Sequence, residues 1–374
     1  MIKRILYIVN LLLVLLLLLA QSAAYVSPST YDKLSLLTYS YPFLVLINAI
    51  FCILWLFVKI RFTIVPLAAL ILQINSIPLM VNYSKENLNL FSSKNAPNIL
   101  EKEADILENA PNIFQADTDS VKSTLLNFAT YNVCGFGYAS DDRNATFDSV
   151  LALLKSHDID VVAMQDFPRI SVKHAWHNKL LAAGYKYFFS LDPDGSIVDK
   201  SVIYSKFPLG KTGGLLAWAE EPGEFIFADV RKGNKEFRIY NFHLASYLLS
   251  QEEHKLHKVK DKESIVRKLL AANRLRAKEV NDISETIATT EKPFLVVGDF
   301  NDTPFSYTYH KLSKHLSDCF VKKGRGFGIT YNQLAVPFRI DYVLASKDFT
   351  TMAYDSPKCK YSDHFPVFVV LKLQ

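Results

Sequence analysis

Cysteine is scarce in this chain, and its four residues do not outline a disulfide framework. Cys52 lies in a long apolar run, and Cys134 lies inside a polar motif that a disulfide would distort. Cys319 and Cys359 could pair in an oxidising compartment, and the sequence leaves that pairing open. No group of cysteines and histidines has the spacing of zinc ligands. The composition therefore points away from disulfide-stapled domains and from zinc sites.

The chain also lacks a glycine-rich nucleotide-binding fingerprint. The nearest candidate, Gly324 to Gly328, neither follows a clear strand nor opens a helix, so we expect a flexible turn there. A strong excess of one charge is missing as well, because residues 125–374 carry 33 Lys and Arg against 29 Asp and Glu. The basic residues nevertheless cluster at Lys255 to Lys278 and again at 322–325. Two readings of these clusters stay open: a surface for a phosphate backbone or an anionic headgroup, and a solvated helix face.

Long apolar runs, by contrast, dominate the start of the chain. We predict a membrane region over residues 1–81, with helices at about 5–24, 43–58 and 62–81. The first run is also compatible with a signal peptide, because Gln21 to Ala24 supplies the small residues of a cleavage site. The third run is interrupted by prolines and polar residues, so it is the weakest of the three as a membrane span.

Basic residues around these runs predict an orientation. Lys3 and Arg4 precede the first run, and Lys59 and Arg61 fill the short turn between the second and third. The positive-inside rule places both sets in the cytoplasm. Three crossings then put the remainder of the chain on the extracytoplasmic side of the cytoplasmic membrane, whereas two crossings would put it in the cytoplasm. Residues 82–123 are polar and indicate a tether.

The segment Val296 to Asp302 contains the first candidate catalytic residues. Its sequence, Val-Val-Gly-Asp-Phe-Asn-Asp, predicts a buried strand that ends in a glycine turn and then offers Asp299 and Asn301. On an extended backbone, side chains two residues apart point to the same side. A carboxylate beside a neutral amide suits phosphate-ester hydrolysis, because the acid can take a proton from water and the amide can bind an anionic oxygen.

Polar residues of a few types also flank several other apolar stretches. They are Asn132 in Tyr-Asn-Val-Cys-Gly, Asp166 after Asp160 to Gln165, His243 in Tyr-Asn-Phe-His-Leu, Asp341 in Arg-Ile-Asp-Tyr, and Asp363 with His364 in Ser-Asp-His-Phe-Pro. Taken singly, each is explained equally well as a turn residue, a strand cap or a hydrogen-bonded core histidine. Together they indicate a polar site assembled along the edge of a sheet.

With these motifs in this order, residues 124–374 resemble the endonuclease/exonuclease/phosphatase superfamily, which has the deoxyribonuclease-I-like fold. The resemblance rests on Asn132, the Gln-Asp pair that ends at Asp166, His243, and the motifs Gly-Asp-Phe-Asn, Ile-Asp-Tyr and Ser-Asp-His. It implies an α/β protein, a four-layered α/β sandwich preceded by the N-terminal transmembrane helices. The apolar patterns fit this fold, with helices expected near 147–156, 176–183 and 263–288.

The resemblance also implies a role for each matched residue. The catalytic residues would be Asp299, Asn301, His364, Asp341 and His243; the metal neighbourhood would be Asp166, Asn132 and Asp363; and phosphate contacts would come from Asn132, Asn301 and His243. In this scheme Asp166 binds Mg²⁺ or Mn²⁺, and Asp299 orients or deprotonates the attacking water. His364, paired with Asp341, stabilises charge in the transition state.

One residue departs from the family pattern. Asp166 stands where the family has Glu, and its shorter side chain withdraws the carboxylate from an ion that demands near-octahedral geometry.

Three hypotheses for the function follow. The first is a membrane-anchored, divalent-metal-dependent phosphodiesterase that is nuclease-like. The second is a lipid or headgroup phosphodiesterase resembling sphingomyelinases, since the Trp-Cys-Asp-Arg signature of inositol-polyphosphate 5-phosphatases is absent. The third is a binding protein that retains the fold with a weakened site. The expected partner is a phosphodiester substrate, either nucleic acid or a lipid headgroup.

Overall fold

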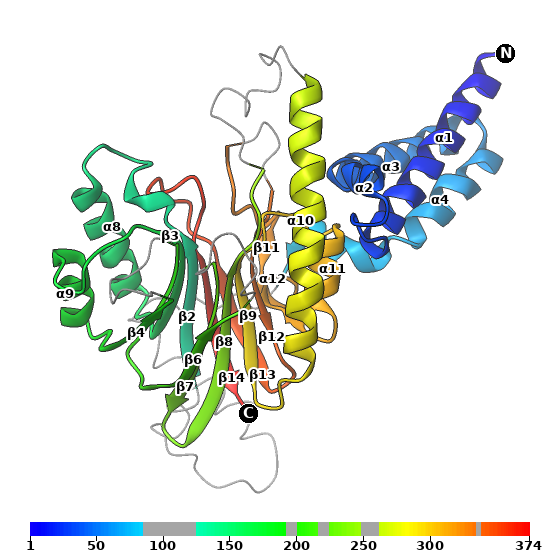
Figure 1. Cartoon of the computed structure of the whole chain (residues 1–374). Coiled ribbons are helices and arrows are strands. Elements are labelled where there is room, and N and C mark those ends of the chain that lie inside the picture. The colour runs from blue at the N-terminus through cyan, green and yellow to red at the C-terminus, as the bar shows by residue number, and fades with distance from the viewer. Residues whose placement is uncertain (85–124, 192–199, 216–223, 248–261, 334–337) are drawn as a thin grey trace, which may run out of the picture. The chain divides into compact units, whose positions relative to one another are not determined.

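The computed structural model describes residues 1–84, 125–191, 200–215, 224–247, 262–333 and 338–374 (Figure 1). These residues divide into two compact units. The first, here called the helix unit, contains Met1–Asn82, Ala245–Ser284 and Asn301–Lys314; the second, the sheet unit, contains Tyr83–Leu244, Glu285–Phe300 and His315–Gln374. The chain therefore passes between the units shortly after the strands that end at His243 and Asp299. The predicted tether at 82–123 falls almost entirely outside the described residues.

Two six-stranded sheets form the sheet unit. The first has the order β10 (Ser317–Asp318), β12 (Asp341–Ala345), β9 (Phe294–Asp299), β8 (Lys235–His243), β7 (Phe225–Lys232) and β6 (Leu209–Gly214). The second has the order β13 (Phe349–Asp355), β14 (Val367–Leu373), β2 (Leu125–Asn132), β3 (Val161–Phe167), β5 (Lys200–Ser205) and β4 (Tyr187–Ser190). Each sheet is mixed, with one parallel pair near its centre, β8–β9 in the first and β2–β3 in the second.

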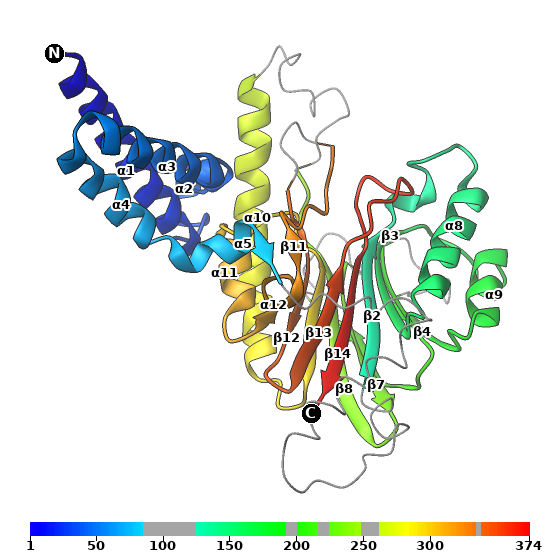
Figure 2. The same ribbon diagram turned by 180° about the vertical axis from the view of Figure 1, so that it is seen from behind.

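Apolar side chains from both sheets meet in one core. Phe128 of β2 and Val369 of β14 pack with Ile239 of β8 and Val297 of β9, and all four are fully buried. A second core lies between the β2-containing sheet and the helices α8 (Arg143–Ser156) and α9 (Ala175–Ala182), which cover that sheet (Figure 2). Two mixed sheets flanked by helices confirm the predicted α/β sandwich.

The local sequence explains how these helices begin. Asp142 precedes α8, and its carboxylate accepts hydrogen bonds from the backbone N–H groups of Asn144 and Ala145 at 3.0 and 3.1 Å. Such a cap satisfies N–H groups that have no partner inside the helix. The helices expected at 147–156, 176–183 and 263–288 correspond to α8, α9 and α10 (Lys262–Ala288).

Gly298 permits the close approach of β8 and β9 beside the polar site. Its φ is +122°, and a Cβ atom there would lie 2.0 Å from the carbonyl oxygen of Phe242. Only glycine avoids that collision. The predicted glycine turn is therefore wrong in detail: Gly298 lies inside β9, which runs on to Asp299 before the extended backbone ends.

The helix unit begins with apolar helices. They are α1 (Ile2–Ser22), η1 (Ala23–Tyr25), α2 (Asp32–Ser35), η2 (Leu36–Ser40), α3 (Tyr41–Val58), η3 (Ile60–Thr63), α4 (Ile64–Ile71), η4 (Ile74–Ser76) and α5 (Ile77–Met80). Ile2–Tyr25 and Asp32–Val58 are each long and apolar enough to span a membrane. The third predicted span is bent by 50° between Ile60–Ile71 and Ile74–Met80, and it adds a third crossing only if the two halves act as one span.

Polar side chains join these helices inside their apolar surroundings. Asn10 of α1 donates to Asn48 of α3 at 3.2 Å and accepts a hydrogen bond from the indole of Trp55 at 3.0 Å. Tyr41 donates to Gln73 at 2.6 Å, and Gln73 donates to Gln21 at 2.9 Å. Hydrogen bonds of this kind hold helices together in an apolar medium, where an unpaired amide is costly.

The remaining helices and strands are short. They are β1 (Asn82–Tyr83), η5 (Cys134–Phe136), α11 (Tyr307–Ser313), α12 (Cys319–Lys323) and β11 (Arg325–Gly326).

The cysteines are not joined by disulfides. Cys319 is a buried free thiol that accepts a hydrogen bond from Thr351, and Cys359 is a free thiol beside the Tyr131 hydroxyl. The disulfide between Cys319 and Cys359 that the sequence left open is therefore not formed in this structure.

Candidate active site

The site gathers where β2, β3, β8 and β9 end and where β12 begins. Asp299, the last residue of β9, is 1% exposed and occupies its centre. Strand pairing brings it level with His243 of β8 on one side and with Asp341 of β12 on the other. Three residues predicted from separate motifs are thus neighbours because the strand register aligns them.

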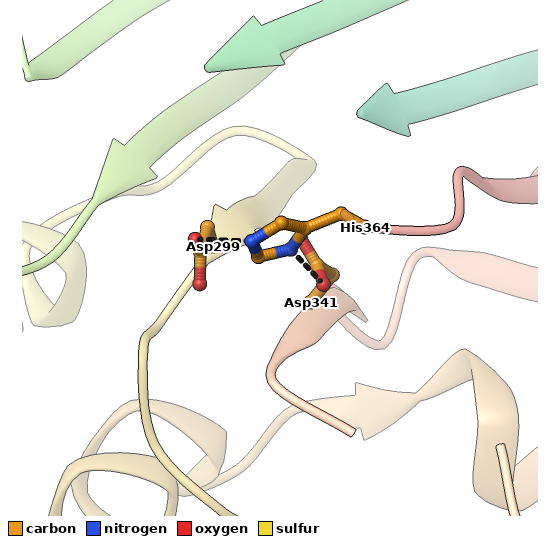
Figure 3. Close-up of side chains that lie close together, drawn as sticks. All are labelled: Asp299, Asp341 and His364. Carbon is orange, nitrogen blue, oxygen red and sulfur yellow. Dashed lines mark hydrogen bonds and ion pairs between the residues drawn. The ribbon is translucent and has the colours of Figure 1, made fainter. Parts of the chain in front are cut away.

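His364 lies between two carboxylates (Figure 3). Its Nδ1 is 2.9 Å from Asp341 Oδ2, and its Nε2 is 3.6 Å from Asp299 Oδ2. The imidazole and Asp341 are almost fully buried. The Asp341 contact fixes the orientation of the ring and leaves Nε2 directed towards Asp299.

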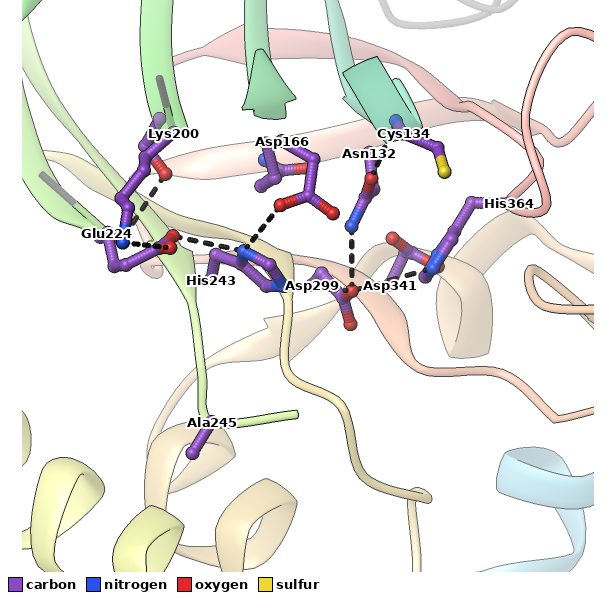
Figure 4. A network of polar contacts seen from close by, with 12 residues as sticks. Asn132, Cys134, Asp166, Lys200, Glu224, His243, Ala245, Asp299, Asp341 and His364 are labelled. Atoms are coloured by element: carbon purple, nitrogen blue, oxygen red, sulfur yellow. Dashed lines mark hydrogen bonds and ion pairs between the residues drawn. The ribbon is translucent and has the colours of Figure 1, made fainter. Parts of the chain in front are cut away.

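His243 repeats this arrangement on the opposite side of Asp299 (Figure 4). Its Nδ1 is 3.0 Å from Glu224 Oε2, and its Nε2 is 3.7 Å from Asp299 Oδ2. Glu224 in turn lies 3.3 Å from the ammonium group of Lys200. Sequence reasoning missed both Glu224 and Lys200, because neither belongs to a motif: Lys200 is the first residue of β5, and Glu224 directly precedes β7.

Asn132 holds the Asp299 carboxylate from above in the view of Figure 4. Its side-chain amide donates to Asp299 Oδ2 at 3.1 Å, and its Oδ1 accepts from the backbone N–H of Cys134 at 3.0 Å. Its backbone carbonyl accepts a hydrogen bond from Ser362 at 2.8 Å. Because both ends of the amide are engaged, Asn132 has one fixed orientation, with its NH₂ group towards the carboxylate.

Asp166 has a strained backbone. Its φ is +48°, and the pairing of β3 with β5 shifts register between Met164 and Phe167, which marks a β-bulge around Asp166. Bulges of this kind redirect a side chain at the rim of a sheet. The carboxylate is 43% exposed and lies 3.4 Å from His243 Nδ1. Asp tolerates positive φ better than Glu, so the backbone gives a physical reason for Asp at this position.

A buried amide network underlies the site. Gln165 donates to Thr130 at 3.0 Å and to Asn241 at 2.6 Å, and Asn241 donates to the carbonyl of Met164 at 3.0 Å. The network joins β2 and β3 of one sheet to β8 of the other, next to Asn132, Asp166 and His243. It fixes the separation of the strand ends, and no sequence pattern indicated that Asn241 takes part.

Carboxylates raise the pKa values of both histidines. Burial alone would lower the pKa of His364, but Asp341 and Asp299 outweigh that effect and raise it to about 10. Burial also opposes protonation of His243, but Asp166 and Glu224 raise its pKa well above the ordinary value. Each imidazole can therefore carry a proton near neutral pH and donate it.

A group of potential cation ligands also lies here. Among the described residues, Asp299, Asp341 and His364 offer ligand atoms that all lie within 4.8 Å of one another. Asp341 Oδ1 is buried and has no hydrogen-bond partner within the described part of the chain. Asp363 is half-buried beside His364 and accepts a hydrogen bond from Ser362 at 3.2 Å. The metal set predicted from sequence, Asp166, Asn132 and Asp363, differs from this group and stays a prediction.

Asn301 is the predicted site residue that the sheet unit does not contain. It is the first residue of a helix-unit segment, it is buried, and its φ is +50°. The extended backbone that would direct Asn301 and Asp299 to the same side therefore does not continue past Asp299. Its predicted contact with phosphate stays a prediction.

Comparison with known proteins agrees with this geometry. Residues 129–364 match the model of the endonuclease/exonuclease/phosphatase family. Residues 3–79 match a second model, described as a domain of unknown function. No curated protein matches the chain.

Solved structures resemble the chain at low sequence identity. An endonuclease/exonuclease/phosphatase from Beutenbergia cavernae is 17% identical, with a TM-score of 0.48 over 67% of this chain and 72% of that one. A family protein from Leptotrichia buccalis is 16% identical, with a TM-score of 0.45 over 67% and 99%. TDP2 from D. rerio, complexed with single-strand DNA product, is 15% identical, with a TM-score of 0.46 over 67% and 99%.

Proposed function

Since this chain belongs to the endonuclease/exonuclease/phosphatase family, a family of hydrolases, we propose that it is a membrane-anchored phosphodiesterase that uses Mg²⁺ or Mn²⁺. The observation that carries the proposal is the environment of Asp299. One buried carboxylate faces the Nε2 atoms of two imidazoles, at 3.6 and 3.7 Å, and each imidazole has its own carboxylate on Nδ1. Such a set of groups can accept a proton and donate one within the same site.

Asp299 acts as the base in this proposal. Its carboxylate is anchored by Asn132 and can orient a water molecule or take its proton. A buried carboxylate normally resists ionisation, but two imidazoles beside it favour the charged form. Asp299 is 1% exposed and has an imidazole nitrogen on either side, at 3.6 and 3.7 Å.

The histidines serve the phosphate. His364, oriented by Asp341, donates to a phosphoryl oxygen or to the departing oxygen, and His243, oriented by Glu224, binds a second phosphoryl oxygen. Asn301 adds a neutral donor for an oxygen of the same group. Positioning and charge neutralisation supply most of the catalysis in phosphoryl transfer, so fixed donors are what the reaction requires.

The chemistry of the donors suits a divalent cation. Mg²⁺ and Mn²⁺ prefer oxygen ligands, and the residues predicted to hold the ion supply a partly exposed carboxylate at Asp166, another at Asp363 and the side-chain oxygen of Asn132, which also accepts from Cys134. His364 suits a donor role better than a ligand role, because both of its nitrogens already face carboxylates. When bound, the cation would neutralise phosphate charge and lower the pKa of a water molecule.

We also propose that the catalytic residues lie on the extracytoplasmic side. Within the helix unit, Tyr39 donates to Asn273 of α10 at 3.1 Å, so the N-terminal part of the candidate span Asp32–Val58 contacts α10. Lys59 and Arg61 follow the other end of that segment, Asp32–Val58, which is long and apolar enough to cross the membrane. The positive-inside rule favours the cytoplasm for these two residues and therefore the outside for α10.

The same contacts favour a retained first helix over a cleaved signal peptide. Asn10 and Trp55 hydrogen-bond inside the bundle, and Leu17 is fully buried there. Removing α1 would leave those polar groups of α3 unpaired in an apolar environment. The mass of the chain purified from membranes checks this point directly.

The substrate is a phosphodiester, and we favour nucleic acid. A nuclease-like role agrees with the basic residues on α10, while the membrane helices suit a lipid headgroup as well. The test is hydrolysis by the full-length chain in detergent with Mg²⁺ or Mn²⁺. The substrates are plasmid DNA, RNA, bis-p-nitrophenyl phosphate, and vesicles of phosphatidylcholine and sphingomyelin, with His364→Ala as the blank.

Each outcome has a distinct meaning. Cleavage of DNA or RNA that His364→Ala abolishes supports a nuclease, and release of headgroups from vesicles alone identifies a lipid phosphodiesterase. Absence of turnover on every substrate with either ion overturns the proposal and leaves a binding protein that retains the fold. Turnover that appears only in Asp166→Glu would assign the loss to the shorter carboxylate.

A further inference from the structure

One arginine of α10 is completely buried in the helix unit. Arg276 is 0% exposed. Its Nη1 donates to the carbonyl oxygen of Ala245 at 2.7 Å, and its Nη2 donates to the Tyr247 hydroxyl at 2.8 Å. Its Nε lies 3.4 Å from Asp302 Oδ2. Burying a guanidinium is costly unless its partners are well placed, so this position calls for an explanation.

The partners of Arg276 belong to the two segments that follow the catalytic strands. Ala245 is the second residue after His243, and Asp302 is the third after Asp299 and the first after Asn301. One guanidinium therefore holds the chain shortly after it leaves β8 and shortly after it leaves β9. Glu279, one turn further along α10, accepts the backbone N–H of Ala245 at 3.0 Å and adds a second attachment.

Residues from the N-terminal region complete the surroundings of Arg276. Asn273 accepts from both Arg276 and the Tyr39 hydroxyl, and it donates to Ser35 at 2.6 Å. The hydroxyl of Tyr39 also contacts that of Tyr247. Ser35 belongs to α2 and Tyr39 to η2, at the start of the candidate span Asp32–Val58 and inside the match to a domain of unknown function.

We propose that Arg276 is a positioning residue for the catalytic segments, and that the N-terminal region completes its binding site through Tyr39 and Ser35. The N-terminal helices then do more than anchor the protein. They fix the guanidinium that holds the segments after His243 and Asp299, so the precise placement of both residues depends on them. Misplacing a catalytic group by about 1 Å can lower the rate by about 100-fold, so modest loosening would be measurable.

A purely structural role is the competing explanation. A buried polar network can contribute to stability alone, and the sheet unit contains such a case in Arg238. Arg238 binds Asp229 at 2.6 Å at the start of β8, whereas His243 ends that strand. Arg238→Met is therefore a matched control, since it removes a buried ion pair from the same strand at the end remote from the site.

The experiment compares Tyr39→Phe, Arg276→Lys and Arg238→Met in the full-length chain. Steady-state kinetics on bis-p-nitrophenyl phosphate gives kcat and KM, and hydrogen exchange reports the backbone at 244–247 and 300–303. We expect Tyr39→Phe and Arg276→Lys to lower kcat by about 10-fold to 100-fold with little change in KM, because they displace groups needed in the transition state. Exchange at both segments should become faster. Arg238→Met should lower only the Tm.

The inference rests on the proposed phosphodiesterase activity for its kinetic readout, but the exchange readout is independent of it. If wild-type protein turns over no substrate, the proposed function fails, and exchange at 244–247 and 300–303 that is faster in Tyr39→Phe and Arg276→Lys but not in Arg238→Met would still support a role of Arg276 in holding both segments. Normal kcat together with a lowered Tm in Tyr39→Phe and Arg276→Lys would make the network structural and overturn the inference. Unchanged exchange at 244–247 and 300–303 in both variants would overturn it as well.

Discussion

The two ends of β8 and β9 use charge in different ways. At the end where the strands begin, Arg238 and Lys292 both bind Asp229, at 2.6 and 2.7 Å, and Glu236 binds Lys292 at 2.5 Å and Arg231 at 2.8 Å. Every charge in this group has an opposite charge in direct contact. We call it the closed end.

At the end where the strands finish, carboxylates outnumber the cationic groups that contact them. The carboxylates are Asp166, Glu224, Asp299, Asp341 and Asp363, and the cationic partners are Lys200, His243 and His364. Contacts there are longer, up to 3.7 Å, and Asp341 Oδ1 has no hydrogen-bond partner among the described residues. We call it the open end.

The difference separates stability from chemistry on the same pair of strands. Paired charges at the closed end stabilise the fold and leave little capacity to bind anything else. Unbalanced carboxylates and oriented imidazoles at the open end are unfavourable for stability, but they can bind a cation and transfer protons. Substitutions at the two ends should therefore affect different measurements.

The largest effect is expected from Asp299→Asn. The amide keeps the shape of the side chain but cannot accept a proton from water, so kcat should fall by about 10²- to 10⁴-fold. The Tm should stay the same or rise, because a buried charge is removed. Steady-state kinetics and calorimetry on the full-length chain check both parts. Wild-type kcat in this variant would remove Asp299 from the role of base.

Glu224→Gln should have a smaller effect on catalysis. It deprives His243 of its anionic partner while keeping a hydrogen-bonding group, so we expect kcat to fall by about 10-fold to 100-fold. Glu236→Gln makes the same chemical change at the closed end and should leave kcat unaltered. An equal loss of kcat in the two variants would show that catalysis depends on the closed end as much as on the open end.

Asp229→Asn should break the closed end. It leaves Arg238 and Lys292 without their shared carboxylate, and disrupting a largely buried pair typically costs about 3–5 kcal/mol. Because Lys292 and Arg238 are partly exposed, we expect a loss near the lower limit of that range in the free energy of unfolding. Urea denaturation measures the loss, and kcat of the folded variant should equal that of wild type.

The smallest effect is expected on the stability of the fold at low pH. Hydrogen bonds from Lys292 and Arg231 lower the pKa of Glu236 from 4.5 to about 2. A lowered pKa in the folded state stabilises the protein above the ordinary pKa, and this contribution is lost as the pH falls towards 2. The pH dependence of unfolding between pH 5 and 2 should be weaker in Glu236→Gln. An identical profile in the variant would mean that the contacts of Glu236 are too exposed to matter.

The sequence predicted the residues of the open end better than the residues that orient them. Asp299, Asp341 and His364 could be found because each follows or precedes an apolar strand within a short motif, and strand register then aligns them. Glu224 and Arg276 could not be found in this way. Glu224 stands beside a strand without a motif, and Arg276 belongs to a helix whose charged residues are also explained by a solvated surface.

Backbone conformation was also beyond the reach of sequence patterns. The positive φ of Asp166 and of Asn301 depends on how the strands end in three dimensions, so neither the bulge at Asp166 nor the end of β9 at Asp299 could be predicted from alternation. Arg276 fits neither reading of the basic cluster at Lys255 to Lys278, a phosphate-binding surface or a solvated helix face, because residues far away in the sequence bury it.

Metal dependence of phosphodiester hydrolysis by the full-length chain tests whether the open end is a catalytic site. Turnover of bis-p-nitrophenyl phosphate is measured after chelation and then during titration with Mg²⁺ or Mn²⁺, in wild-type protein and in His364→Ala. We predict that chelation abolishes turnover, that either ion restores it in wild type, and that neither restores it in His364→Ala. Turnover that survives complete chelation, or that His364→Ala retains in full, would show that the open end is not a metal-dependent catalytic site.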